Sequence, residues 1–134
     1  MNLVLLWFVC VFIFLFHEFG HFLSAVVCKK FGGFVISPLI CGIDLKFPVP
    51  LGEWYAIMFS GVFAGVSLAV FFPTDFPLET IFLIYFAFTI SILDLLLIYM
   101  VRREEKVNPF FKGLTSEDTL VIEFRKFRTG EARI

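Results

Sequence analysis

Residues 2–28 read NLVLLWFVCVFIFLFHEFGHFLSAVVC, an apolar run whose only titratable side chains, cysteines aside, are His17, Glu18 and His21. A helix needs roughly 20 mostly apolar residues to cross the hydrocarbon core of a bilayer, so this stretch predicts a membrane span. It lacks the basic start and the small-residue cleavage site of an export signal, and its apolar run is longer. We therefore expect it to be a retained transmembrane helix.

Two further apolar stretches, residues 55–72 and 81–101, meet the same length criterion. With 60% hydrophobic residues, 21 Phe and only 17% charged residues, the 134-residue chain is too apolar to solvate the surface of a soluble domain. We therefore predict an all-α membrane protein of three transmembrane helices, with a core over residues 1–101 and a cytoplasmic tail over residues 102–134. Membrane lipid is an expected partner, and nucleic acid is not.

The distribution of charge along the chain predicts its orientation. Basic residues follow the first and third spans, at positions 29–30 and 102–106, whereas the turn at residues 73–79 carries only acidic charges. Basic residues next to membrane spans remain on the cytoplasmic side. We therefore expect an integral, multi-pass protein with its N-terminus outside and its C-terminus in the cytoplasm.

The segment between the first two spans, residues 31–53, is rich in Gly and Pro, which favours turns and strands over helix. Apolar and polar residues alternate over residues 43–47, and residues 34–36 form a second β-prone run. Two interpretations stay open. The segment is either a small hairpin at the membrane interface or an irregular loop that lies on the lipid headgroups.

The predicted tail, residues 102–134, carries most of the charges of the chain. Its apolar residues Leu120, Ile122 and Phe124 fit a strand, while Leu120, Phe124 and Phe127 fit a helical face, so its secondary structure is left open. The tail is interpreted either as a segment that only keeps the C-terminus in solution, or as an element for self-association or for binding a regulator.

Titratable side chains inside a membrane are costly, so each one is a candidate for function. His17, Glu18 and His21 form the motif H-E-x-x-H, in which two histidines four residues apart lie one turn above each other on one helix face and can bind one metal ion. Glu18 is offset from His17 by about 100°, so we expect it to act as a general base and not as a ligand.

Asp94, in the third span, is the candidate for the third protein ligand that a catalytic zinc site requires. Measured from the cytoplasmic ends of their spans, His21 and Asp94 are each seven residues deep and His17 is eleven. At about 1.5 Å per residue these depths are roughly 10 to 16 Å, so the three side chains can meet. The alternative is that Asp94 only forms a hydrogen bond to a neighbouring helix. Zinc (Zn²⁺) is the expected ion, although iron, cobalt or manganese can occupy the same ligands.

With these motifs, the chain resembles the site-2 protease family of intramembrane zinc metalloproteases, reduced to its catalytic core and matched over residues 1–101. The H-E-x-x-H motif matches the zinc-binding motif of that family. Leu93 and Asp94 match a Leu-Asp pair whose aspartate is the third zinc ligand in the family. The resemblance therefore implies zinc ligation by His17, His21 and Asp94.

The second span contains small residues, among which Gly61 and Gly65 are four apart. Such residues let membrane helices approach closely, which is their ordinary role. The same pair also matches the looser form of the family's central G-x-x-x-(N/S/G) motif. The chain departs from the family around Asp94, because the Asn and Pro that usually precede the Leu-Asp pair, and the Gly that follows it, are absent.

We therefore expect an intramembrane zinc metalloendopeptidase that hydrolyses a peptide bond of a transmembrane protein substrate with a zinc-activated water and with Glu18 as the general base. The alternative is a catalytically silent zinc-binding scaffold, or pseudoprotease, that binds transmembrane helices without cutting them. Glu18 favours the enzyme, because a scaffold has no use for a general base.

Overall fold

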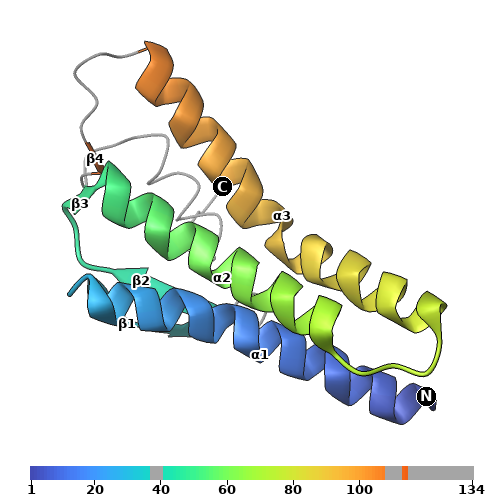
Figure 1. Ribbon diagram of the computed structural model, residues 1–134. Coiled ribbons are helices and arrows are strands. Elements are labelled where there is room, and N and C mark those ends of the chain that lie inside the picture. The colour runs from blue at the N-terminus through green and yellow to red at the C-terminus, as the bar shows by residue number, and fades with distance from the viewer. Residues whose placement is uncertain (37–40, 108–112, 115–134) are drawn as a thin grey trace, which may run out of the picture.

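The computed structural model describes residues 1–36, 41–107 and 113–114. Its main elements are three helices, namely α1 (Leu3–Val27), α2 (Leu51–Phe71) and α3 (Pro77–Val107) (Figure 1). All three are long and apolar enough to cross a membrane. The prediction of three apolar helices is therefore confirmed, and these helices fit a membrane protein.

Two helices extend beyond the predicted spans. α2 begins at Leu51, so the last residues of the predicted loop 31–53 are helical, and α3 continues to Val107, so the first residues of the predicted tail are helical as well. The Tyr55 hydroxyl donates to Glu105 Oε2 at 2.9 Å, and Arg102 donates to the same oxygen at 2.9 Å. The first of these bonds joins the first residue of the predicted second span to the extension of α3, and the second lies within that extension.

α2 lies between α1 and α3 and packs along both, whereas α1 and α3 touch over a shorter length (Figure 1). The approach of α1 to α2 is close at Gly20. A Cβ atom built there would lie 2.5 Å from the Ser60 carbonyl oxygen and 2.9 Å from Ala64 Cβ. The Ser60 hydroxyl also donates to the Gly20 carbonyl oxygen at 2.9 Å. Only glycine permits this separation of the two helices.

At the end of the bundle where α1 and α3 begin, an ion pair joins the first residue of the chain to the first turn of α3. The Met1 ammonium lies 2.6 Å from Glu79 Oε1. This hydrogen bond, together with the charge of Glu79, raises the pKa of the ammonium above its usual value. The contact shows that the start of α1 and the start of α3 lie at the same end of the molecule.

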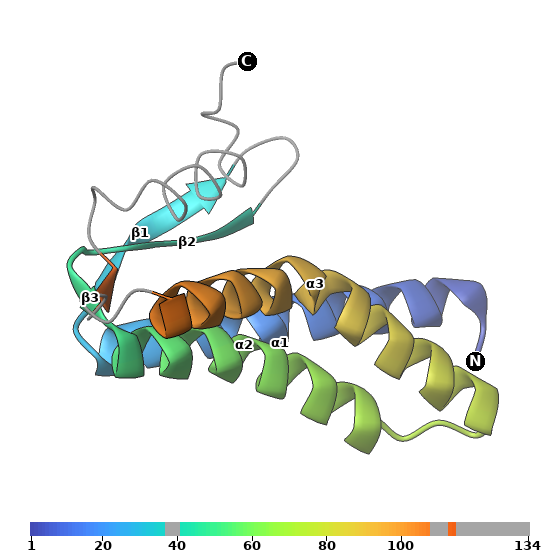
Figure 2. The ribbon, with the colours of Figure 1, turned by 90° about the horizontal axis from the view of Figure 1, so that it is seen from above.

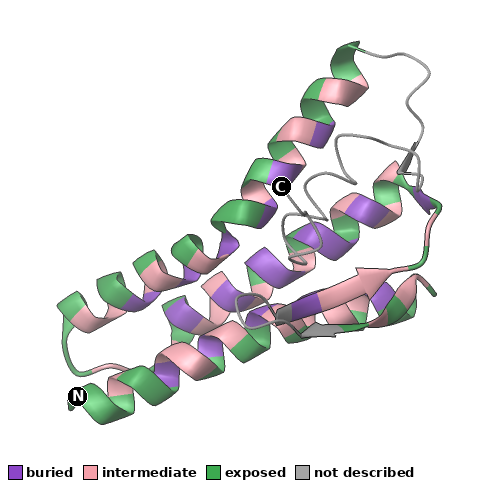
Figure 3. Ribbon diagram, turned by 180° about the vertical axis from the view of Figure 1, so that it is seen from behind, coloured by how far each residue is buried: buried purple, intermediate pink, exposed green. Residues whose placement is uncertain are grey.

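Buried positions recur along all three helices (Figure 3). They form two apolar clusters with a polar group between them. The buried polar and charged side chains in the described part of the chain are His17, His21, Ser91 and Asp94. The cluster toward the turn between α2 and α3 contains Val9, Ile13, Ala69, Leu83 and Ala87. The cluster at the opposite end contains Val49, Trp54, Met58, Leu97 and Val101. The polar side chains therefore continue the buried stripes of α1 and α3.

The segment after α1 forms a hairpin of β1 (Phe31–Ile36) and β2 (Cys41–Leu45), with Phe34 opposite Ile43 (Figure 2). Of the two interpretations of this segment, the hairpin is therefore confirmed. The rings of Phe31 and Phe34 both contact the ring of Phe22, with centroids 5.0 and 5.5 Å apart. This aromatic contact attaches the hairpin to the last turns of α1.

A second strand pair joins β3 (Val49–Pro50), directly before α2, to β4 (Gly113–Leu114). It brings one part of the predicted tail beside the buried residue Val49, two residues before α2 begins. The strand- or helix-like pattern of residues 120–127 lies outside the described residues.

Gly20→Ala is expected to lower the free energy of unfolding by about 1–3 kcal/mol, because the added methyl group forces α1 and α2 apart. The measurement is SDS-induced unfolding in mixed micelles, followed by circular dichroism. Gly52→Ala, also in a helix, is the matched control, since a Cβ there meets no described atom within 4 Å. Equal stability of the two variants would contradict the close approach at Gly20.

Candidate metal centre

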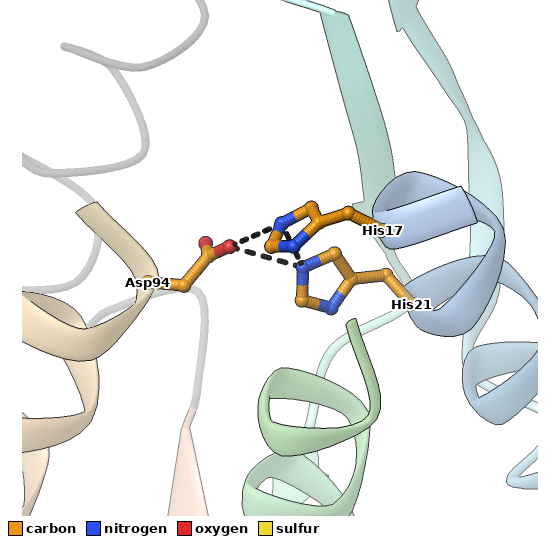
Figure 4. A group of neighbouring side chains, drawn as sticks. All are labelled: His17, His21 and Asp94. Carbon is orange, nitrogen blue, oxygen red and sulfur yellow. Dashed lines mark hydrogen bonds and ion pairs between the residues drawn. The ribbon is translucent and has the colours of Figure 1, made fainter. Parts of the chain in front are cut away.

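Three side chains from two helices converge at the centre of the bundle (Figure 4). His17 Nε2 lies 2.9 Å from Asp94 Oδ2, His21 Nε2 lies 3.0 Å from the same oxygen, and the two Nε2 atoms are 3.1 Å apart. All three side chains are at most 3% exposed. The structure thus brings the three proposed ligands together, with one ligand atom of each at a common point.

The helical spacing of α1 produces the histidine pair. Because four residues make slightly more than one turn, His17 and His21 project from the same face, and their rings meet edge to face at a centroid distance of 4.7 Å. That face is turned into the bundle. Asp94 reaches the pair from α3, about two turns beyond Ala87, the last buried residue of the first apolar cluster on that helix.

α2 supplies no ligand side chain, yet it shapes the space that the rings occupy. A Cβ atom at Gly61 would collide with the His21 ring, and one at Gly65 would lie 3.2 Å from His17 Cβ. The two glycines, which the sequence assigns to helix packing, therefore also leave room for the two imidazoles. α2 contributes a backbone contact too, because His21 Nδ1 lies 2.8 Å from the Ile57 carbonyl oxygen.

This backbone contact determines the tautomer of His21, and thus whether Nε2, the nitrogen that faces Asp94, carries a hydrogen or a lone pair. A carbonyl oxygen only accepts hydrogen bonds, so Nδ1 carries the hydrogen, and in the neutral ring Nε2 is then an acceptor. The aspartate oxygen 3.0 Å away is an acceptor as well. Two such atoms attract one another only through a proton or a cation placed between them. Hydrogen bonding of the second imidazole nitrogen to a carbonyl is also the usual arrangement of a metal-binding histidine.

The spacing of the ligand atoms fits a small divalent ion. Zinc forms bonds of about 2.0–2.1 Å to histidine nitrogen and carboxylate oxygen, so neighbouring ligands of a tetrahedral site lie about 3.3 Å apart. The three separations here, 2.9 to 3.1 Å, are within a few tenths of an ångström of that value. Two imidazoles and one carboxylate are also the donor set of catalytic zinc sites with an open fourth position. The buried group of His17, His21 and Asp94 can therefore hold a metal ion.

Glu18 lies beside these ligands and is not one of the three converging residues. Its Oε1 is 3.9 Å from His17 Nε2, and its side chain is 15% exposed, compared with 1% for His17. The carboxylate thus lies between the buried ligands and the surface of α1.

Two contacts of the histidines escape sequence reasoning. The first is the Ile57 carbonyl, which the sequence does not mark because every residue has a backbone carbonyl. Only the rotation of α2 directs this one at His21. The second is Ser91, whose Oγ lies 3.2 Å from His17 Nδ1. A signal existed for Ser91, because it precedes Asp94 by three residues and therefore shares its helix face.

Comparisons of the chain with models of known families, with curated proteins and with solved structures find no match. The resemblance to the site-2 protease family rests on the motif residues themselves.

Asp94→Ala is expected to leave the purified protein with little bound zinc, because one of three ligand atoms is removed and the two histidines alone bind weakly. Metal content per chain is measured by mass spectrometry after equilibration in a zinc buffer. Glu18→Gln is the control and is expected to retain zinc, since its Oε1 lies outside the converging group. Unchanged zinc in Asp94→Ala would contradict the site.

Proposed function

We propose that the protein is an intramembrane zinc metalloprotease of the site-2 protease type, which hydrolyses a peptide bond of a membrane-spanning substrate. The observation that carries this proposal is the convergence of His17, His21 and Asp94, with the Glu18 carboxylate beside them, inside a bundle of three apolar helices. Burying these groups in a membrane costs about 3 kcal/mol or more for each charged side chain. A sequence retains such groups where they bind or react.

In this proposal His17 Nε2, His21 Nε2 and Asp94 Oδ2 bind the zinc ion. The chemistry that zinc supplies in such a site is Lewis-acid polarisation of the substrate carbonyl and of the attacking water. The ligands are almost fully buried, so the surrounding dielectric constant is low, and charges that develop at this point interact more strongly than they do in water.

Glu18 transfers the proton. Its carboxylate takes a proton from the attacking water as the oxygen bonds to the substrate carbonyl carbon, and gives it to the leaving nitrogen as the carbon–nitrogen bond breaks. Of the four residues, Glu18 has the most exposed side chain, at 15%. We therefore place the entry of water and substrate on the side of α1 that carries Glu18.

A transmembrane substrate must present an extended backbone, because its peptide bonds are hydrogen-bonded while it is helical. The β1 and β2 hairpin offers strand edges to which such a segment can add. It lies close to the reaction site along the chain, because Phe22, which holds Phe31 and Phe34, directly follows the ligand His21. This proximity supports strand addition as the way in which substrate is held.

For the orientation we propose an N-terminus outside and a cytoplasmic C-terminus. The contact of Met1 with Glu79 supports this arrangement, because it gathers the start of α1 and the acidic turn at one end of the bundle. The basic residues that follow α1 and those that end α3 are then at the other end.

Glu18→Gln is expected to lower the rate of cleavage by about 10²–10⁴-fold, because it removes the general base while leaving the ligands in place. The assay uses casein in detergent and a panel of single-span proteins in liposomes, with zinc content measured on the same samples. Glu104→Gln, which changes a half-buried carboxylate far along α3, is the control and retains activity. If zinc-loaded wild type cleaves none of these, the result favours the scaffold. If Glu18→Gln cleaves as well as wild type, the proposed mechanism with Glu18 as the general base is wrong.

Strand addition is tested by disulfide cross-linking from Phe34→Cys, in a Glu18→Gln protein whose three native cysteines are replaced by serine. Single cysteines are placed at successive positions around the cleavage site of a substrate found in that assay. Because successive side chains of a strand alternate between faces, cross-links are expected at every second position. Phe63→Cys, on the exposed face of α2, is the control. A repeat of three to four residues would indicate a helical substrate and contradict strand addition.

A further inference from the structure

Ser91 is fully buried on α3, at 0% exposure, and lies next to a proposed ligand without being one itself. Its hydroxyl donates to the Ala87 carbonyl oxygen at 2.8 Å, and its Oγ lies 3.2 Å from His17 Nδ1. The proposed hydrolysis assigns no role to this side chain. Because it contacts Nδ1 and the proposed metal lies at Nε2, it is on the opposite side of the His17 ring from the metal.

The hydrogen atoms of this contact can be assigned. A serine hydroxyl has one hydrogen, and the Ala87 carbonyl can only accept, so the hydrogen points at Ala87 and Oγ presents a lone pair to His17. His17 Nδ1 must then carry the hydrogen of the neutral ring and donate it to Ser91. Nε2 is left with its lone pair, directed at the point shared with His21 and Asp94.

The opposite arrangement is less favourable. A hydrogen on His17 Nε2 would require the Ser91 hydroxyl to turn from Ala87 toward Nδ1, which leaves a buried carbonyl without this partner. In either arrangement His21 Nε2, whose tautomer is fixed by Ile57, faces Asp94 Oδ2 acceptor to acceptor, so a proton or a cation must lie between these two atoms. Both histidines therefore favour the tautomer in which Nε2 can bind a metal ion.

We infer that Ser91 is a positioning residue for the metal centre, which holds His17 in the tautomer and orientation needed for zinc binding through Nε2. The Ile57 carbonyl does the same for His21. The two ligands of α1 are thus oriented by different helices, His17 by α3 and His21 by α2. This inference rests on the metal centre of the proposed function and not on peptide hydrolysis.

The affinity of the protein for zinc, measured by competition with a chromophoric chelator, tests the inference. Ser91→Ala is expected to bind zinc about 10–100-fold more weakly, which is the usual effect of removing a partner of a metal-binding histidine. Ser91→Thr keeps a hydroxyl and is expected to recover most of the affinity. Thr89→Ala is the matched control, because Thr89 makes the same 2.8 Å bond to a carbonyl four residues earlier but is exposed.

A second measurement reads the tautomer itself and requires no metal. The chain has two histidines, so nitrogen-15 spectra of histidine-labelled protein contain signals from two rings alone. In metal-free wild type and Thr89→Ala, both rings are expected to carry hydrogen on Nδ1. In Ser91→Ala, the ring of His17 is expected to change to a mixture of tautomers while that of His21 does not.

The inference is overturned if Ser91→Ala binds zinc as tightly as wild type, or if Thr89→Ala loses as much affinity. It is also overturned if the His17 tautomer is the same with and without the Ser91 hydroxyl. These results are separate from those for the proposed function. If the protein cleaves no substrate, the zinc affinities and the nitrogen-15 spectra still test the role of Ser91. If the wild type binds no zinc, the proposed function is wrong, and the spectra alone test the contact between Ser91 and His17.

Discussion

The structure depends on one constraint, which is that two imidazoles and a carboxylate buried inside an apolar bundle must find hydrogen-bond or ionic partners there. The three ligand atoms lie within 3.1 Å of one another, between two clusters of apolar side chains. None of the three helices meets the constraint alone. α1 carries both rings, α3 carries the acid, and α2 carries the glycines that make room for the rings and the carbonyl that orients one of them. Bundle packing and the polar centre therefore stabilise each other, because a shift of any helix leaves a buried polar group without its partner.

Small residues have a double role in this arrangement. In membranes, glycine at a helix interface ordinarily serves close packing. Gly20 does so here, since its lack of a side chain sets the approach of α1 to the backbone of α2 at Ser60. Gly61 belongs to the same interface, but the space that a side chain would take there is filled by the His21 ring. The interface that holds α1 to α2 is thus continuous with the wall of the candidate site, and α2, which carries no ligand side chain, influences the geometry of both rings.

The sequence predicts the three helices and the convergence of His17, His21 and Asp94 well, because titratable residues are rare in apolar runs and the four-residue spacing of the histidines directs them to one face. It predicts helix ends less well. The start of α2 and the end of α3 are joined by the bond from Tyr55 to Glu105, which joins residues 50 apart in the sequence and has no local signal. The Gly-rich segment allows either a hairpin or an irregular loop, and the contact that attaches the hairpin to α1 is that of Phe22, again a tertiary feature. The pairing of β3 with β4 had no sequence signal either.

Around Asp94 the chain departs from the site-2 protease motif that it resembles, and this departure affects the shape of the candidate site. Without the Asn and Pro that usually precede the Leu-Asp pair, α3 runs as one helix from Pro77 to Val107. An unbroken helix keeps its backbone donors and acceptors in its own hydrogen bonds, so it has few to offer to an extended substrate. It does, however, place a residue one turn before Asp94 on the same inward face, and that residue is Ser91, bonded to the Ala87 carbonyl as only a regular helix allows. In this chain the third helix is therefore suited to orienting His17, whereas under the proposed function the backbone groups offered to an extended substrate are those of the hairpin beside α1.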